Sequence, residues 1–294
     1  LSKVLYPNDG TDEGRRLRLK QQHFFVSCSL QDMLRSLEKR SIPITDFSKH
    51  WTVQLNDTHP AIAVAELMRL LVDQYHISWD KAWNITNQSV AYTNHTLLPE
   101  ALEKWDLHLF NDLLPRHLEI IYEINWRFLQ QLRLKYPGDD KILRKLSIID
   151  EDGSKSVRMA HLATIGAHHI NGVAALHSDL IKRQLLPEFA KLWPEKFTNV
   201  TNGVTPRRWV ALANPGLAEL LEKELGPNWI TNMKLLNNLE SKQNDTNFLN
   251  KFQETKLLGK RKLSNYIHSQ TGILVDPSSL FDVQVKRIHQ YKRQ

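Results

Sequence analysis

Residues 281–294 read FDVQVKRIHQYKRQ, and this stretch decides the fold class. Its first five residues alternate between apolar and polar side chains, which predicts a strand with one buried face. Five potential cations follow within eight residues: Lys286, Arg287, His289, Lys292 and Arg293. Open α/β folds bind anions where a strand carries such groups to its carboxyl end. We therefore predict an α/β protein with an anion site after residue 285.

The positive charge of the chain is concentrated near that stretch. The formal net charge is +7, and residues 251–294 contain nine Lys or Arg against three acids, which is +6 of that excess. A nucleic-acid binder usually spreads its basic groups over a face together with aromatic side chains. We therefore expect no nucleic-acid partner. No run of about 18 apolar residues occurs, so we expect no contact with a membrane.

The length and the cysteine content of the chain predict a two-domain protein in a reducing compartment. A chain of 294 residues corresponds to about two domains. Asn202-Gly203 is the best boundary, because this dipeptide favours a turn, and it separates residues 1–202 from residues 203–294. The single cysteine, Cys28, excludes an intrachain disulfide framework and favours a cytoplasmic location. Asn-x-Ser/Thr triplets would indicate glycosylation of a secreted protein, but we interpret them as turn and cap residues.

Helical patterns dominate the first two thirds of the chain. Apolar spacing and cap residues predict helices over 61–75, from 78, from Pro99 to about 105, from Pro115 to 137, over 159–185 with an interruption near Asn171-Gly172, and over 246–269. Short strands are predicted at 53–55, 146–149 and 281–285.

Three polar segments interrupt these patterns and are candidate site segments. VQLNDTHP (53–60) ends a strand with a carboxylate and an imidazole two residues apart, YTNHT (92–96) lies between helices, and TNGVTPRRW (201–209) sets two arginines beside a tryptophan. An arginine pair beside an indole suits an anion held against an aromatic face. The alternatives are a capped turn, a structural histidine and a solvated arginine pair.

Two other groupings receive a structural interpretation. His161, His168, His169 and His177 lack the i, i+4 spacing of helical zinc sites, so we expect no metal. Glu100 and Glu103, three residues apart, could act as an acid and base pair. Two carboxylates at a helix start more often lie on a solvated face, where their charge interacts favourably with the helix dipole. We interpret Glu100 and Glu103 in that way.

Taken together, the motifs resemble those of the α-glucan (glycogen, starch or maltodextrin) phosphorylases. The matching segments are LYPND (5–9), LNDTHP (55–60), YTNHT (92–96), LPRH (114–117), TNGVTPRRW (201–209) and FDVQVKRIHQYKR (281–293). Their order and spacing extend the resemblance over essentially the whole chain.

The resemblance implies a fold and a reaction. The fold would be α/β of glycosyltransferase-B type, with two Rossmann-like domains, of which residues 1–202 form part of the first and residues 203–294 begin the second. The enzyme would use inorganic phosphate to release the terminal glucose of an α-1,4-glucan as α-glucose 1-phosphate with retention. Pyridoxal 5′-phosphate would be the cofactor, whose 5′-phosphate shuttles a proton, so that no pair of catalytic carboxylates is needed. The complete enzyme would be a homodimer.

The resemblance also assigns roles to residues of the matching motifs. Arg287 and Lys286 would recognise phosphate, Lys292 would lie beside the phosphates, and Tyr291 would bond a sugar hydroxyl. His95 and Asn202 would hold the glucose through its 6-hydroxyl, and Asp57 and His59 would edge the cavity. Arg208, Trp209, Lys286 and Lys292 would line the cofactor pocket. Asp9 resembles the acid of a mobile gate loop.

The sequence departs from the family pattern at two points. Gly10 follows Asp9 where many relatives have Asn, which weakens the expected contact of that loop with a sugar. A Gly-Asn-Met-Lys-type motif for the Schiff-base lysine does not occur, so we expect this lysine outside the chain, as in an internal fragment of a longer enzyme. The alternatives are a glycosyltransferase that uses a nucleotide sugar and a glucan-binding module without activity.

Overall fold

The computed structural model describes residues 1–294 except 5–6, 8, 99–101, 284 and 286–294. The chain divides into two compact units, Leu1–Asn202 and Gly203–Gln294, and each is described by itself. Their assignment to a first and a second Rossmann-like domain remains a prediction. No helix of the described residues is both long and apolar enough to cross a bilayer.

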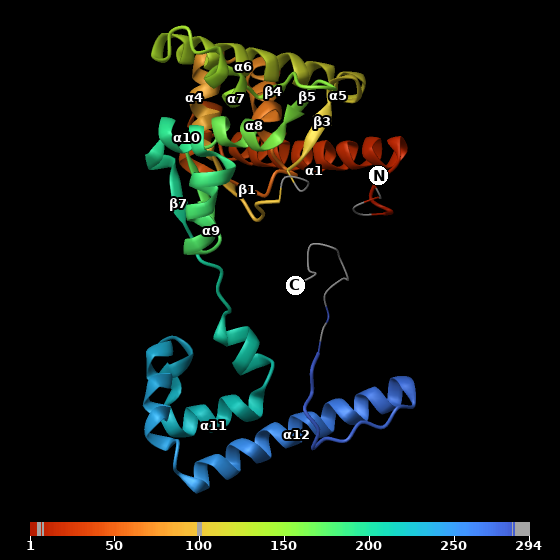
Figure 1. The fold of residues 1–294 in the computed structure, drawn as a ribbon, viewed down its shortest axis with the longest axis vertical. Coiled ribbons are helices and arrows are strands. Elements are labelled where there is room, and N and C mark those ends of the chain that lie inside the picture. Colours follow the sequence, from red (N-terminus) through yellow and green to blue (C-terminus); the bar gives the residue numbers. More distant parts are fainter. Residues whose placement is uncertain (5–6, 8, 99–101, 284, 286–294) are drawn as a thin grey trace. The chain divides into compact units, whose positions relative to one another are not determined.

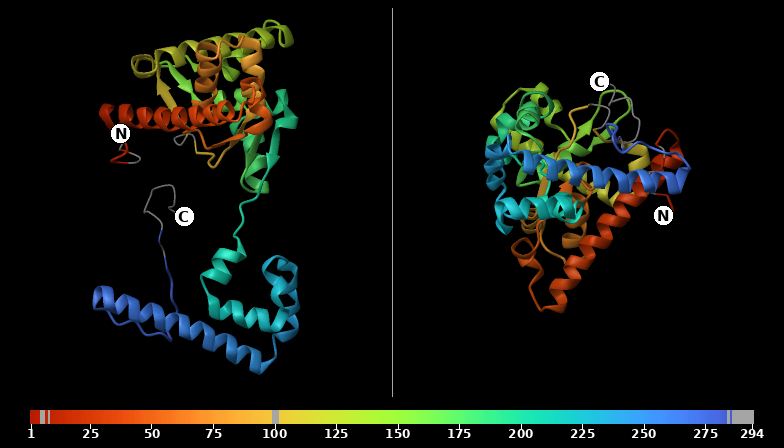
Figure 2. Two further views of the ribbon diagram at one scale, coloured as in Figure 1. Left: turned by 180° about the vertical axis from the view of Figure 1, so that it is seen from behind. Right: turned by 90° about the horizontal axis from the view of Figure 1, so that it is seen from below.

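A parallel sheet forms the centre of the first unit (Figures 1 and 2). Its strands lie in the order β1-β2-β6-β7, with β1 at Val53–Asn56, β2 at Val90–Thr93, β6 at His169–Gly172 and β7 at Phe197–Asn199. All three strand pairs are parallel. Parallel strands need crossover connections, usually helices, and are covered on both faces. Accordingly Leu55, Val90, Tyr92 and Ile170 are at most 1% exposed.

Ten α-helices of the described residues belong to the first unit, besides short π-helical and 3-10 segments. They are α1 (Asp12–Lys39), α2 (Phe47–His50), α3 (Ala63–Arg69), α4 (Trp79–Ser89), α5 (Leu107–Leu113), α6 (Pro115–Lys135), α7 (Asp140–Leu146), α8 (Met159–Gly166), α9 (Ala175–Leu180) and α10 (Pro187–Leu192). The long helix α1 begins at a Thr11 cap whose hydroxyl accepts from the Gly14 amide. Proline occupies the first turn of α6, which is the position where its missing N–H costs least. Predictions of helices over 61–75, from 78 and from Pro115 are confirmed.

A small antiparallel sheet, β3-β5-β4, replaces the helix predicted from Pro99 to about 105. Its strands are β3 (Lys104–Asp106), β4 (Ile149–Asp150) and β5 (Ser156–Arg158). Trp105 pairs with Val157 and is 5% exposed. The helix prediction is wrong over 104–106, because pairing with a strand distant in the sequence outweighs local helix preference. Residues 99–101 lie outside the described part of the chain.

The predicted interruption near Asn171-Gly172 is a strand of the central sheet. Strand β6 separates α8 from α9, so the predicted interruption is confirmed, and its being a strand was not predicted. A Cβ built on Gly172 would lie 2.8 Å from Cα and 2.9 Å from N of Ser178, the backbone of α9. Glycine is required here because α9 packs directly against the end of β6.

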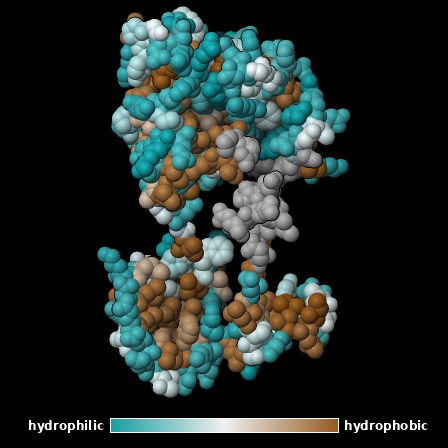
Figure 3. Space-filling view, viewed as in Figure 1, coloured by the Kyte–Doolittle hydropathy of each residue, from teal (hydrophilic) through white to brown (hydrophobic). Residues whose placement is uncertain are grey.

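The second unit is helical in its described residues. It contains α11 (Pro215–Leu225) and α12 (Thr246–Thr271), with shorter helical segments at Arg207–Leu212, Pro227–Ile230 and Met233–Lys242. Asp245 caps α12 through the Phe248 amide, and Gly272 ends it at φ 75°. Apolar residues, brown in Figure 3, remain exposed on this unit. In α12, Leu249, Phe252, Leu258, Leu263 and Tyr266 are 37–63% exposed.

The predicted strand over 281–285 is absent from the residues that the structure describes there, 281–283 and 285. Val283 is 64% exposed and Val285 is 88% exposed, so the alternation does not bury one face. A strand requires a partner for its backbone groups. The described residues of the second unit contain no other strand that could pair with it.

Candidate functional site

A pocket of about 590 Å³ lies where β1 and β2 end. Its walls come from α1, from the segment after β1 and from the segment after β2, and its lining residues are Arg18, Gln21, Gln22, Phe25, Val26, Asn56, Asp57, His59, Pro60 and His95. The carboxyl ends of parallel strands are where α/β sheets bind ligands. Three predicted site residues, Asp57, His59 and His95, are thereby brought to one cavity.

Asp57 shows both backbone strain and an unsatisfied acceptor. Its φ is 67°, a left-handed conformation that a residue with a Cβ rarely adopts. Its Oδ1 is buried and has no hydrogen-bond partner among the described residues. Burial raises the pKa of this carboxyl, and positive charge on His59 and His95 opposes that shift. Such features gather at functional sites, and Oδ1 is free to accept a ligand hydroxyl.

His59 lies between two carboxylates. Its Nδ1 is 3.2 Å from Glu103 Oε1, and its Nε2 is 3.6 Å from Asp57 Oδ2. The hydrogen bond to Glu103 raises the pKa of His59, against the opposing effect of burial. Our interpretation of Glu103 as a solvated helix residue is wrong, since its side chain is only 11% exposed. Glu100 lies outside the described residues.

A second hydrogen-bond network holds the segments that carry His95 and Asn202. His177 Nδ1 accepts from the Val173 amide at 3.0 Å, so its Nε2 donates to Asn94 Oδ1 at 3.1 Å. The Asn202 amide donates to the Val173 carbonyl at 2.9 Å. Hydrogen bonds through His177 and Val173 therefore connect the two predicted glucose-binding segments. The side chains of His95 and Asn202 remain exposed.

Asp9 is directed to α1. Arg18 Nη1 donates to Asp9 Oδ2 at 2.8 Å, and Arg15 Nη1 reaches the Asp9 carbonyl at 3.5 Å. Arg18 also lines the pocket. The segment that contains Asp9 is thus linked to the pocket wall through one guanidinium, and its role as a gate remains a prediction.

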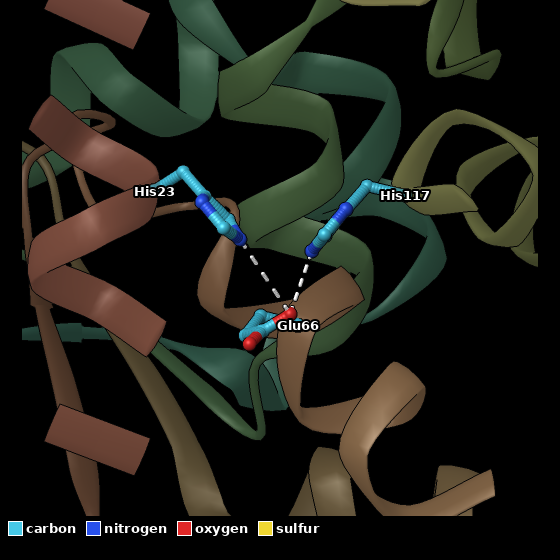
Figure 4. Close-up of side chains that lie close together, drawn as sticks. All are labelled: His23, Glu66 and His117. Carbon is cyan, nitrogen blue, oxygen red and sulfur yellow. Dashed lines mark hydrogen bonds and ion pairs between the residues drawn. The ribbon is translucent and has the colours of Figure 1, made fainter. Parts of the chain in front are cut away.

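A buried carboxylate anchors the α1 wall of the pocket (Figure 4). Glu66 of α3 is 0% exposed and accepts from Ser27 Oγ at 2.6 Å, from Arg69 Nε at 2.7 Å and from His117 Nε2 at 2.6 Å. His23 Nε2 lies 3.9 Å away. Since Ser27 and His23 belong to α1 and His117 to α6, one charge joins three helices.

The same cluster contains metal-ligating atom types. The ligand atoms of His23, Glu66 and His117 lie within 4.8 Å of one another. Two ligands of one metal ion are not in hydrogen-bonding contact, whereas His117 Nε2 and Glu66 Oε2 are 2.6 Å apart. Glu66 is also bonded twice by the Arg69 guanidinium, which would repel a cation. The geometry indicates shared protons rather than a metal ion.

The histidines considered for a metal have structural partners. His161 Nδ1 lies 2.9 Å from the Ser147 carbonyl, and burial lowers its pKa to about 4. His168 and His169 face each other at the start of β6 with their Nδ1 atoms 2.7 Å apart. His177 holds Asn94 as described above.

The remaining predicted site residues belong to the second unit or lie outside the described residues. Arg208 and Trp209 are in the helical segment Arg207–Leu212, and both are exposed, Trp209 by 63%. Lys286, Arg287, Tyr291 and Lys292 fall within the stretch that the structure does not describe. Their roles stay predictions.

Sequence reasoning missed the residues that α1 contributes to the pocket, among them Arg18 and Gln22. Gln22 and Arg18 of α1 contact Glu103, with Gln22 Nε2 2.7 Å and Arg18 Nε 3.8 Å from Oε1. Their i, i+4 spacing on a long helix was the available signal. That spacing reveals a shared face and does not reveal that the face meets a strand end.

Comparison with known proteins finds similarity to one protein family along the whole chain. The sequence profile of a family described as "Carbohydrate phosphorylase" matches residues 1–294. A glycogen phosphorylase of Synechocystis sp. is 59% identical over 294 residues, one of Chlamydia trachomatis is 49% identical over 294 residues, and the muscle form of Bos taurus is 47% identical over 302 residues. Each alignment covers 100% of this chain and 35–36% of the relative. The chain thus spans about a third of the length of these relatives.

Proposed function

Because the chain belongs to the carbohydrate phosphorylase family, we propose that the enzyme of which it forms part is an α-1,4-glucan phosphorylase. It would transfer the terminal glucose of a glycogen- or starch-like chain to inorganic phosphate and release α-glucose 1-phosphate with retention. The observation that supports this most directly is the pocket at the ends of β1 and β2, which brings Asp57, His59 and His95 together. Asp57 Oδ1, which is buried and has no hydrogen-bond partner among the described residues, suits a hydroxyl-rich ligand.

We assign the glucose unit to this pocket. His95 lines it, and the Asn94–His177–Val173 network fixes the backbone on which His95 and Asn202 are carried. A rigid support of this kind maintains the orientation of groups that contact a sugar hydroxyl. Asp57 would accept a hydrogen bond from the sugar at its rim, and Tyr291 would bond a further hydroxyl.

Phosphate recognition would fall to the basic stretch after residue 285. A planar guanidinium binds a phosphate through two parallel hydrogen bonds, which suits Arg287, and an ammonium acts as a point charge, which suits Lys286 and Lys292. The glycosyltransferase-B fold and a homodimer belong to the same proposal.

The donor set near Arg208 fits a phosphate ester attached to an aromatic ring. Arg208 offers a guanidinium and Trp209 an indole, and both side chains are exposed. We propose that they contact pyridoxal 5′-phosphate together with Lys286 and Lys292. When bound, the cofactor supplies a phosphate group that takes part in proton transfer.

The test is the requirement for phosphate and for the sugar 6-hydroxyl. The complete enzyme should release glucose 1-phosphate from maltoheptaose only when inorganic phosphate is present, and free glucose or a need for a nucleotide sugar would contradict the proposal. In the reverse direction, wild type should discriminate against 6-deoxyglucose 1-phosphate by roughly 10-fold or more, because a site built for a hydroxyl is left with unpaired polar groups. His95→Ala and Asn202→Ala should lower turnover and lose most of that discrimination.

A further inference from the structure

We propose that Glu103 is a positioning residue of the pocket, whose carboxylate fixes the His59 ring and fastens α1 to the segment after β1. The contacts of Glu103 that support this role all lie within the first unit. Only the nature of the substrate, a glucose unit, rests on the proposed function.

The contacts of Glu103 come from two separate elements. Oε1 accepts from Gln22 Nε2 at 2.7 Å and lies 3.2 Å from His59 Nδ1, while Oε2 accepts from Thr58 Oγ1 at 3.3 Å. Arg18 Nε adds a charge 3.8 Å from Oε1. An ionised carboxylate accepts about four hydrogen bonds, so one side chain satisfies donors from α1 and from residues 58–59. Separating these two walls would require breaking several bonds at once.

Glu103 acts through its neighbours. Arg18, Gln22 and His59 line the pocket, whereas Glu103 is not among the lining residues and its side chain is 11% exposed. It is therefore placed behind the pocket wall. A group in that position controls the orientation of the lining side chains and does not itself contact the ligand.

The effect on His59 is electrostatic as well as geometric. With Nδ1 toward Glu103 and Nε2 toward Asp57, both ring nitrogens face carboxylates, which favours the imidazolium. The charges facing the ring are Glu103 and Asp57, which stabilise the imidazolium, and Arg18, which opposes it. His95 adds positive charge near Asp57.

The imidazolium in turn affects the ligand-facing acceptor. Burial raises the pKa of Asp57, and a positive His59 opposes this shift and favours the carboxylate. Glu103 has two opposed effects on Asp57: its own charge raises the pKa of the Asp57 carboxyl, while the His59 imidazolium that it stabilises lowers that pKa. Without Glu103, the His59 imidazolium would lose its main stabilising partner.

The first experiment follows the His59 ring by NMR in the 294-residue chain. The His59 signal is assigned by its loss in His59→Asn, and its titration midpoint is compared between wild type and Glu103→Gln, which preserves size and removes charge. We expect the midpoint to fall. In Glu119→Gln, an exposed carboxylate on α6, the midpoint should not move. An unchanged midpoint in Glu103→Gln would overturn the proposal, and a merely structural role would not shift it.

The second experiment measures kinetics in the complete enzyme. Glu103→Gln should raise KM for glucose 1-phosphate roughly tenfold, the effect of losing one charged hydrogen bond, with a smaller change in kcat. In the His59→Asn background the same substitution should raise KM clearly less than it does in wild type, because the part of the effect that passes through the His59 ring is already lost. Additive effects of the two substitutions would contradict this.

A third variant keeps the test decisive. If Glu103→Gln fails to fold, Glu103→Asp takes its place. This variant keeps the negative charge but moves it away from His59 by the length of one methylene group. The titration midpoint of the His59 ring should then lie below that of wild type. A midpoint equal to that of wild type would overturn the proposal. The NMR result also stands if the complete enzyme proves to lack phosphorolysis, in which case the proposed function fails and the positioning role of Glu103 is still decided.

Discussion

Glu66 is a charged group without solvent exposure, and its partners decide whether it stabilises the first unit. Burial alone would raise its pKa, but hydrogen bonds from Arg69, His117 and Ser27, together with His23 at 3.9 Å, outweigh burial and lower the pKa. A carboxyl whose pKa is lower in the folded state contributes stability above its ordinary pKa of 4.5. That contribution is lost as the pH falls through the folded-state pKa.

We predict that Glu66→Gln destabilises the first unit by about 3 kcal/mol at neutral pH, because it leaves the Arg69 guanidinium and a buried His117 without their carboxylate. The difference should shrink as the pH falls below about 4.5 toward the lowered folded-state pKa, where wild type also begins to lose the charge. Denaturant unfolding between pH 3 and pH 7 measures this. Glu119→Gln, whose side chain is 66% exposed, is the control and should cost less than about 1 kcal/mol. A pH-independent difference would contradict the assignment of charge to Glu66.

At the scale of elements, the site depends on how closely α9 approaches the end of β6. Ser178 of α9 donates to Asn199 Oδ1 of β7 at 2.7 Å, and His177 of the same helix holds Asn94 after β2. One short helix therefore links three strand ends. The contact with Gly172 sets its distance from the sheet.

We predict that Gly172→Ala costs about 2 kcal/mol of unfolding free energy, because its Cβ would meet the Ser178 backbone and α9 would have to move. The His177 ring should also lose its bond to Asn94, which an NMR shift of its Nε2 proton would report. Gly203→Ala is the matched control, since a Cβ there meets nothing within 4 Å. Equal stabilities of the two variants would show that α9 is not held at this distance.

The elements also show which predictions local sequence supports. Helices such as Pro115–Lys135 were predicted because the apolar period and the cap residues lie within the helix itself. Strand β3 was missed because its stability comes from Val157, which a local window does not contain. Glu103 was misinterpreted for the same reason, since its burial depends on Gln22 and His59. The expected strand over 281–285 had the right period but no partner in the described residues.

For the whole molecule, apolar burial is unequal between the two units. The core cluster runs from Leu19 to Phe197 and lies entirely within the first unit. In the described part of the second unit, Leu220, Leu221 and Trp229 are the buried apolar residues. Cooperative unfolding requires a contiguous core, and the first unit has its own.

We therefore predict that residues 1–202, produced alone, fold and unfold in a single cooperative transition. Tryptophan fluorescence can follow this, because six of the eight tryptophans precede residue 203. Leu67→Ala, at a position that is 0% exposed, should lower the unfolding free energy of this piece by about 2–5 kcal/mol. That shift would show that the transition reports the core of the parallel sheet. If residues 1–202 instead bind a hydrophobic dye and unfold without a cooperative transition, the parallel sheet and the helices packed on it need residues beyond 202. The boundary at Asn202 would then have to be moved.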